Sequence, residues 1–154
     1  ATMKQRKFNK KDFKKIHPAG NLGAQLKTVE DIMLKDNAIP FVNENLKIKD
    51  ALKVLSKKKL GFLLVRDAKK LSRGFVSDGD IRRLTQKKQN LHNISIKEIM
   101  TKNPIGIDKN ELAAKALSLM NNKKITSLCV YNKKNKFKTI GVLHIHNILQ
   151  SNIS

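Results

Sequence analysis

The sequence predicts an α+β fold in which two β-α-β-β-α units are related by a pseudo-two-fold axis. Three observations support this prediction. The 154-residue chain repeats itself after 65 to 67 positions, each copy carries an amphipathic helical stripe, and each stripe is followed by two apolar strands. Neither unit can bury one face of its sheet alone, so we expect the two sheets to pack against each other.

The repeat is clearest at its ends. Val29–Met33 corresponds to Ile96–Met100, and Gly74 corresponds to Gly141, each 67 positions further on. Between these points the matches lie 65 positions apart: Asn45, Ala51, Leu52, Lys58, Lys59, Leu63 and Val65 correspond to Asn110, Ala116, Leu117, Lys123, Lys124, Leu128 and Val130. The changes in spacing fall before the first helix and in the second hairpin, where loops are expected.

Each unit is expected to begin with a short extended segment, Ile39–Val42 in the first copy and Pro104–Ile107 in the second. A helix follows, because apolar residues recur at i, i+3, i+4 and i+7. The residues on this stripe are Ile48, Ala51, Leu52 and Leu55 in the first copy, and Ala113, Ala116, Leu117 and Met120 in the second.

Two strands and a final helix complete each unit. The first strands are Phe62–Arg66 and Ser127–Tyr131, and the second strands are Leu71–Val76 and Phe137–Leu143. Polar turns at residues 67–70 and 132–135 separate them. The last helices are expected to begin near Asp78 and Ile145.

The charge of the chain is strongly positive, with a net value of +21. Of the 33 basic residues only five are arginines, the residue that readers of phosphates and bases favour; aromatic residues are 5% and tryptophan is absent. We therefore interpret the charge as a solvated lysine surface. A lysine-rich module that binds nucleic acid stays a less favoured alternative, with steep salt dependence as its signature.

The location expected for this chain is the cytoplasm. Its longest apolar run, Leu60–Val65, is far shorter than the roughly 20 residues of a membrane span. The start has charge without an apolar signal-peptide segment, and we interpret Ala1–Thr2 as a tag remnant. The single cysteine, Cys129, lies in an apolar run and is expected to be a small buried hydrophobic residue.

Two sequence runs carry a family resemblance. Gly74–Asp80 (GFVSDGD) and Gly141–Asn147 (GVLHIHN), together with an Ile-Met pair before each unit, resemble the motifs of a CBS-domain pair. This resemblance implies one CBS repeat at 29–88, a linker at 89–95 and a second repeat at 96–154. A nucleotide-binding cleft is then expected in each repeat.

A narrower resemblance comes from Ser77–Arg83, Gly141–His146 and Phe13–Leu26. These runs are similar to arabinose 5-phosphate isomerases of the KpsF/GutQ type, although Ala19 departs from their usual His-Pro-Gly-Gly. Residues 1–28 would then be the tag remnant followed by the C-terminal remnant, or linker, of a sugar-isomerase (SIS) domain that the chain itself lacks. His17 would be catalytic only in the intact enzyme.

That resemblance implies a regulatory role. The parent enzyme would convert ribulose 5-phosphate to arabinose 5-phosphate for the Kdo sugar of lipopolysaccharide, and this chain alone would not be an enzyme. Its partners would be its own SIS domain and further copies of itself, as a CBS-pair dimer within a tetramer. The expected ligands are AMP, ATP, CMP or CMP-Kdo, with no required cofactor; a structural oligomerisation module without ligand is the alternative.

The first cleft carries the stronger chemistry. A carboxylate such as Asp80 can accept both hydroxyls of a ribose, and the Ser77 hydroxyl precedes a helix N-terminus that favours phosphate. The resemblance implies that the base lies between residues 39–41 and residues 61–62, and the arginines could reach phosphates. The candidate nucleotide-binding residues are Ile39, Pro40, Phe41, Gly61, Phe62, Ser77, Asp80, Arg82 and Arg83. As an alternative, Asp80 is only a helix-terminal acid that stabilises the helix dipole.

The second cleft is expected to bind more weakly. His144 stands where the motif has Ser or Thr, and Asn147 stands where it has the ribose-binding Asp. Ile105 and Thr126 complete the candidate residues of this cleft. No carboxylate or thiol set accompanies His144 and His146, so we expect no metal site.

Overall fold

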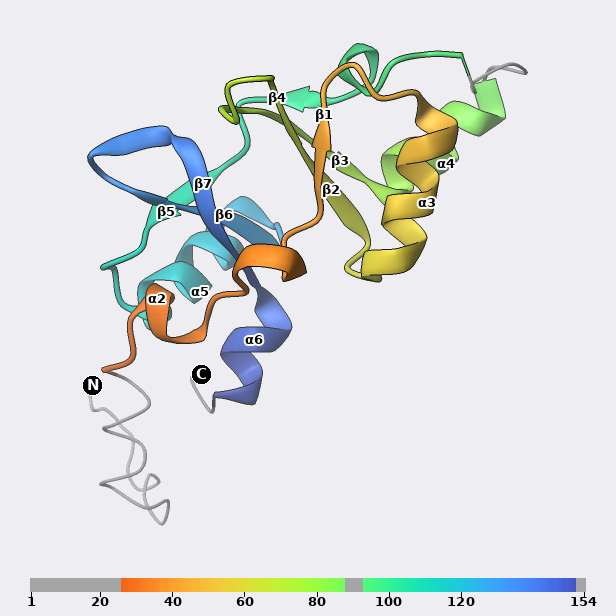
Figure 1. Ribbon diagram of the computed structural model, residues 1–154. Coiled ribbons are helices and arrows are strands. Elements are labelled where there is room, and N and C mark those ends of the chain that lie inside the picture. Colours follow the sequence, from red (N-terminus) through yellow and green to blue (C-terminus); the bar gives the residue numbers. More distant parts are fainter. Residues whose placement is uncertain (1–25, 88–92, 152–154) are drawn as a thin grey trace.

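The computed structural model describes residues 26–87 and 93–151, and it confirms two β-α-β-β-α units of an α+β fold (Figure 1). His17 lies outside the described residues. In the first repeat the elements are β1 (Phe41–Asn43), α3 (Ile48–Lys58), β2 (Phe62–Arg66), β3 (Ser72–Ser77) and α4 (Asp78–Lys87). In the second they are β5 (Gly106–Asp108), α5 (Ala113–Lys123), β6 (Ser127–Asn132), β7 (Asn135–His144) and α6 (Ile145–Gln150).

The two central helices are built alike. The buried residues of α3 and α5 lie on the apolar stripe that the sequence predicts, with Ala51 and Ala116 fully buried at matching positions. Each helix then ends on a lysine in the left-handed conformation, Lys59 at φ 58° and Lys124 at φ 57°. Among the described residues no helix is long and apolar enough to cross a membrane.

Each repeat forms a small mixed sheet. The strands that follow α3 and α5 run parallel to the strands that precede these helices, whereas β2–β3 and β6–β7 are antiparallel hairpins. β7 begins at Asn135, two residues earlier than expected. The Asn132 side chain accepts a hydrogen bond from the Lys134 amide and confines the turn to fewer residues.

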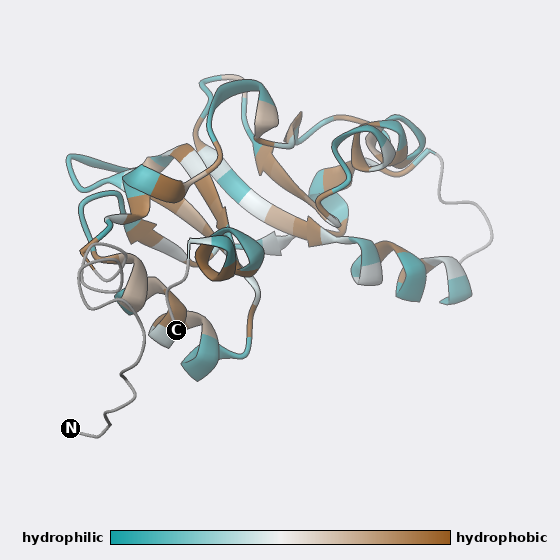
Figure 2. Ribbon diagram, turned by 90° about the horizontal axis from the view of Figure 1, so that it is seen from below, coloured by the Kyte–Doolittle hydropathy of each residue, from teal (hydrophilic) through white to brown (hydrophobic). Residues whose placement is uncertain are grey.

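The sheets pack against each other, as expected, and the strands alternate accordingly. In β2, Leu63 and Val65 face the helices, while Phe62 and Leu64 face the other sheet. Cys129 and Val142 meet them from repeat 2. Figure 2 shows hydrophobic residues along the central strands and hydrophilic ones on the outer helices and turns.

A short segment before each repeat packs onto the other repeat. α2 (Val29–Ile32) lies beside α5, and its first amide donates to the carbonyl of Glu111. The corresponding 3-10 helix η3 (Ile96–Glu98) sits on repeat 1, where the Ile96 amide donates to the carbonyl of Leu46. Val29, which comes directly before repeat 1, is fully buried in the core of repeat 2, and Ile96, which comes directly before the strands of repeat 2, is fully buried in the core of repeat 1. We call residues 28–34 and 95–102 the exchanged segments.

Each exchanged segment ends on a strand of the opposite sheet. β4 (Thr101–Lys102) pairs with β3 next to Gly74, and Leu34 forms a bridge with Val142 of β7. The methionine of each Ile-Met pair lies directly over a glycine: Met100 over Gly74 and Met33 over Gly141. The two most visible matches of the sequence repeat are therefore contact partners across the two-fold axis.

Replacing Gly74 with alanine tests this contact. A Cβ at this position would lie 2.5 Å from Sδ of Met100 and 2.8 Å from the carbonyl oxygen of Thr101. We expect Gly74→Ala to lower the free energy of unfolding by about 1–3 kcal/mol, as overpacked cores do. Urea unfolding followed by circular dichroism measures it.

Gly79→Ala is the matched control, because its nearest neighbour to a Cβ is Nη1 of Arg83 at 3.4 Å. This change in the first turn of α4 should be neutral or stabilising. On a Met100→Ala background, Gly74→Ala should cost less than it does in the wild type, since the two Met100 atoms that crowd the added Cβ are then gone. Equal effects of the two glycine changes would contradict the proposed packing.

Candidate functional site

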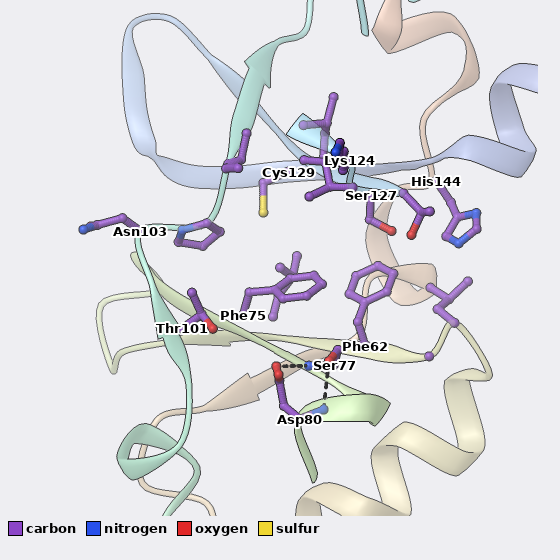
Figure 3. Close-up of a pocket in the computed structure, with 18 of the residues that line it drawn as sticks. Phe62, Phe75, Ser77, Asp80, Thr101, Asn103, Lys124, Ser127, Cys129 and His144 are labelled. Atoms are coloured by element: carbon purple, nitrogen blue, oxygen red, sulfur yellow. Dashed lines mark hydrogen bonds between the residues drawn. The ribbon is translucent and has the colours of Figure 1, made fainter. Parts of the chain in front are cut away.

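A cavity of about 560 Å³ opens between the two repeats (Figure 3). One wall comes from repeat 1, with Phe62 on β2, Phe75 and Ser77 on β3, and Asp80 on α4. The opposite wall comes from repeat 2: residues 124–129, which run from the end of α5 into β6, and His144 at the end of β7. Residue 101, near the end of the second exchanged segment, and residues 103–105, which follow that segment, line the cavity as well.

Asp80 and Ser77 hold each other in place at the N-terminus of α4. Oδ2 of Asp80 accepts from the Ser77 amide at 2.9 Å, and Oγ of Ser77 accepts from the Asp80 amide at 3.0 Å. This reciprocal pair is a capping box, so the helix-terminal role considered for Asp80 is present. Oδ1 of Asp80 accepts from Nη2 of Arg83 at 2.5 Å. Asp80 therefore has one oxygen in the cap and one oxygen toward an exposed, displaceable arginine.

Repeat 2 has a similar cap with different chemistry, in which the side chain of the first cap residue bonds to the amide two residues on rather than three. Oδ1 of Asn147 accepts from the His144 amide at 2.8 Å, and Nδ1 of His144 accepts from the His146 amide at 3.1 Å. Asn147 thus performs the capping part of the role of Asp80 without its charge. The chain itself demonstrates that an amide suffices for this cap.

Both caps are tied to the loop that precedes the central strand. The Asp78 amide donates to the carbonyl of Gly61 at 2.8 Å, and the Ile145 amide donates to that of Thr126 at 2.8 Å. Gly61 has φ 81°, which a side chain rarely tolerates. These bonds fix the start of each final helix against the rim of the cavity.

The interior of the cavity is largely apolar. The rings of Phe62 and Phe75 stack with centroids 5.2 Å apart and planes 18° from parallel. Ile105 keeps 40% of its surface exposed at the cavity and lies next to Pro104. Flat apolar surfaces of this kind suit an aromatic base.

The charges at the cavity favour an anion. Arg83 and Lys124 line it together with a single carboxylate, Asp80. Cys129 also lines it, but burial raises the pKa of its thiol to about 11, so the thiolate nucleophile is absent at neutral pH. The arrangement can bind a ligand with hydroxyls, a flat ring and negative charge. Among the described residues, the lining includes no activated nucleophile.

The cavity gathers candidate residues that the sequence assigns to two clefts. Gly61, Phe62, Ser77, Asp80 and Arg83 of the first group line it, and so do Ile105, Thr126 and His144 of the second. It is therefore a shared site, with one part from each repeat.

Five candidate residues do not line this cavity. Ile39 and Pro40 are buried, with Ile39 packed in the interface between the sheets. The ring of Phe41 lies under the Arg66 guanidinium at 3.9 Å, and Arg82 pairs with Asp78 at 3.0 Å on the exposed side of α4. Asn147 is engaged in its cap.

Sequence reasoning missed the residues that approach from the other repeat. Asn103, Pro104 and Lys124 are the main ones, because their place at the cavity depends on the exchanged segment and on the packing of the two sheets. Phe75 could have been predicted from the sequence, since it lies two residues before Ser77 and therefore on the same face of the strand.

Comparisons with known proteins agree with this architecture. The CBS domain family model matches residues 29–87 and 96–153. Arabinose 5-phosphate isomerase KdsD of Yersinia pestis is 34% identical over 154 residues, and protein RP505 of Rickettsia prowazekii (strain Madrid E) is 36% identical over 150. The matches cover 99% and 97% of this chain, which spans 46% of the length of each relative.

Among solved structures, CBSX2 in complex with AMP superposes with a TM-score of 0.71 at 27% identity. The match covers 81% of this chain and 95% of that one. Two family matches in tandem, relatives along the whole chain and a shared fold give the same answer as the motifs at 74–80 and 141–147. The chain belongs to the CBS domain family and is a CBS pair homologous to part of the KdsD arabinose 5-phosphate isomerases.

Proposed function

We propose that this CBS pair is the regulatory part of an arabinose 5-phosphate isomerase and binds an adenine nucleotide in the cavity between its repeats. The parent enzyme would act in the cytoplasm on ribulose 5-phosphate, in the supply of Kdo for lipopolysaccharide. Its SIS domain and further copies of the chain would be the partners of this module. The nucleotide would tune the attached domain by binding one arrangement of the modules better than another.

The observation that carries the proposal is the composition of the cavity. Asp80 offers a charged acceptor to ribose hydroxyls, because within residues 26–87 and 93–151 its side-chain partner is the exposed Arg83 alone. Phe62, Phe75 and Ile105 offer apolar surface to a base. A volume of about 560 Å³ is in the range of small-molecule pockets.

The charged side chains at the cavity further restrict the class of ligand. With Arg83 and Lys124 against one carboxylate, a phosphate-bearing nucleotide is favoured over the uncharged nucleoside and over a cationic ligand such as S-adenosylmethionine. The AMP complex of CBSX2 supports the adenine nucleotide. CMP and CMP-Kdo, the product-like ligands of the same biosynthesis, are the rival nucleotides.

Titration calorimetry with AMP at moderate salt tests the proposal, with Asp80→Asn as the variant. The asparagine can still accept from the Ser77 amide, as Asn147 does from His144 in repeat 2, so the fold should be retained. Loss of the charged acceptor should weaken AMP binding by about tenfold or more, since such hydrogen bonds contribute roughly 1.5–3 kcal/mol.

Asp78→Asn is the matched control. Asp78 lies in the same turn of α4 but pairs with Arg82 away from the cavity, so AMP affinity should change by less than about twofold. Equal AMP binding by wild type and Asp80→Asn would contradict the ribose role. If AMP, ATP, CMP and CMP-Kdo all fail to bind or shift the Tm, the module is structural rather than a sensor.

A further inference from the structure

His144 has two ring nitrogens in different surroundings. Nδ1 accepts a hydrogen bond from the His146 amide at 3.1 Å and so caps α6. Because an amide only donates, Nδ1 carries no proton, and the proton of the neutral ring lies on Nε2. Within residues 26–87 and 93–151 no hydrogen bond engages Nε2.

The ring lies at the cavity opposite the carboxylate wall. Figure 3 places His144 on the repeat 2 side, across the cavity from Asp80 and Ser77. An ionised aspartate only accepts hydrogen bonds, whereas Nε2–H of the neutral imidazole only donates. The two side chains therefore differ in their hydrogen-bonding role: Asp80 supplies an acceptor from repeat 1, and His144 supplies a donor from repeat 2.

We infer that His144 determines specificity in this cavity: through Nε2–H it donates a hydrogen bond from repeat 2 to a phosphate oxygen of the nucleotide whose ribose hydroxyls Asp80 accepts from repeat 1. This inference rests on the proposed function. One nucleotide is then hydrogen-bonded by both repeats, and these two contacts fix its orientation. A nucleoside that lacks the phosphate loses the contact to repeat 2.

The groups around His144 keep it neutral. It is half-buried, and its pKa is lowered by burial and, to a lesser extent, by the ring of His146, whose centroid is 4.8 Å away. Asp80, Arg83, Lys124 and Cys129 are the other ionisable groups that line the cavity. The two cations oppose protonation of the ring, and Asp80 is already paired with Arg83.

Acid should therefore destabilise the protein through His144, without any ligand. Below about pH 6.5 the unfolded imidazole takes up a proton that the folded one resists, so the unfolded state binds more protons and the Tm falls with pH. Asparagine places an acceptor where Nδ1 lies and does not titrate. His144→Asn should flatten the fall in Tm between pH 7 and 5, whereas His146→Asn should retain most of it.

Two variants separate the two nitrogens. His144→Asn retains an acceptor for the His146 amide but removes the part of the ring that contains Nε2. His144→Gln has a donor at the distance of Nε2 but no acceptor at the position of Nδ1. The probes are AMP and adenosine, measured by calorimetry, and stability is followed by Tm.

Wild type should prefer AMP to adenosine. His144→Asn should leave Tm at neutral pH and adenosine affinity nearly unchanged, and reduce the AMP preference by about tenfold. His144→Gln should lower Tm and retain most of the AMP preference. His146→Asn should retain it too.

An AMP preference that survives His144→Asn within about twofold would overturn the inference and leave the proposed function intact. Failure of the wild type to bind either probe would overturn both. Long-range ¹H–¹⁵N spectra give a readout independent of ligand: a neutral His144 protonated on Nδ1 would also overturn the inference.

Discussion

The whole molecule depends on the packing of the two exchanged segments, each of which crosses over to the other repeat. Val29 completes the core of repeat 2, and Ile96 completes the core of repeat 1. Met33 and Met100 then lie on the bare backbone of Gly141 and Gly74. Because each repeat borrows its first turn from the sequence that precedes the other, neither core is complete by itself. The pair folds as one unit.

The cavity is a consequence of this crossing. After η3 the chain pairs with β3 as β4 and then returns to its own sheet at β5, and residues 103–105 line the cavity on that path. The hydroxyl pair of Ser72 and Thr139, 2.5 Å apart, joins β3 to β7 across the same interface. A change in the relative position of the two sheets would therefore alter the cavity directly. This geometry suits a module that reports ligand occupancy to a neighbouring domain.

The two caps illustrate how a symmetric scaffold carries asymmetric chemistry. Asp80 and Asn147 make the same hydrogen bond, because each accepts from the amide of the residue three positions earlier, Ser77 or His144. In return the Ser77 side chain accepts from the amide of Asp80, and the His144 side chain accepts from the amide of His146, one position nearer. The backbone role is satisfied equally by a carboxylate and by an amide. The side chains are then free to differ toward the cavity, with an anionic acceptor in one repeat and an imidazole in the other.

The sequence was informative where structure is local. The apolar stripes of α3 and α5, the apolar strand that begins at Phe62 and the helix-terminal acid Asp80 all follow from the pattern of residues along the chain. The crossing of the exchanged segments could not be predicted, because the sequence of an Ile-Met pair does not indicate in which of the two cores it is buried. For the same reason His144 was assigned to a second cleft and Lys124 and Pro104 to none. Their place at the cavity depends on contacts between residues far apart in sequence.

If one nucleotide is held by both repeats, an AMP titration followed by backbone ¹H–¹⁵N spectra will detect it in both at once. We expect the signals of the amides of Ser77 and Asp80 in repeat 1 and of Thr126 and His144 in repeat 2 to shift together along a single binding curve. Shifts confined to one repeat, or two curves with separate midpoints for the two repeats, would contradict it.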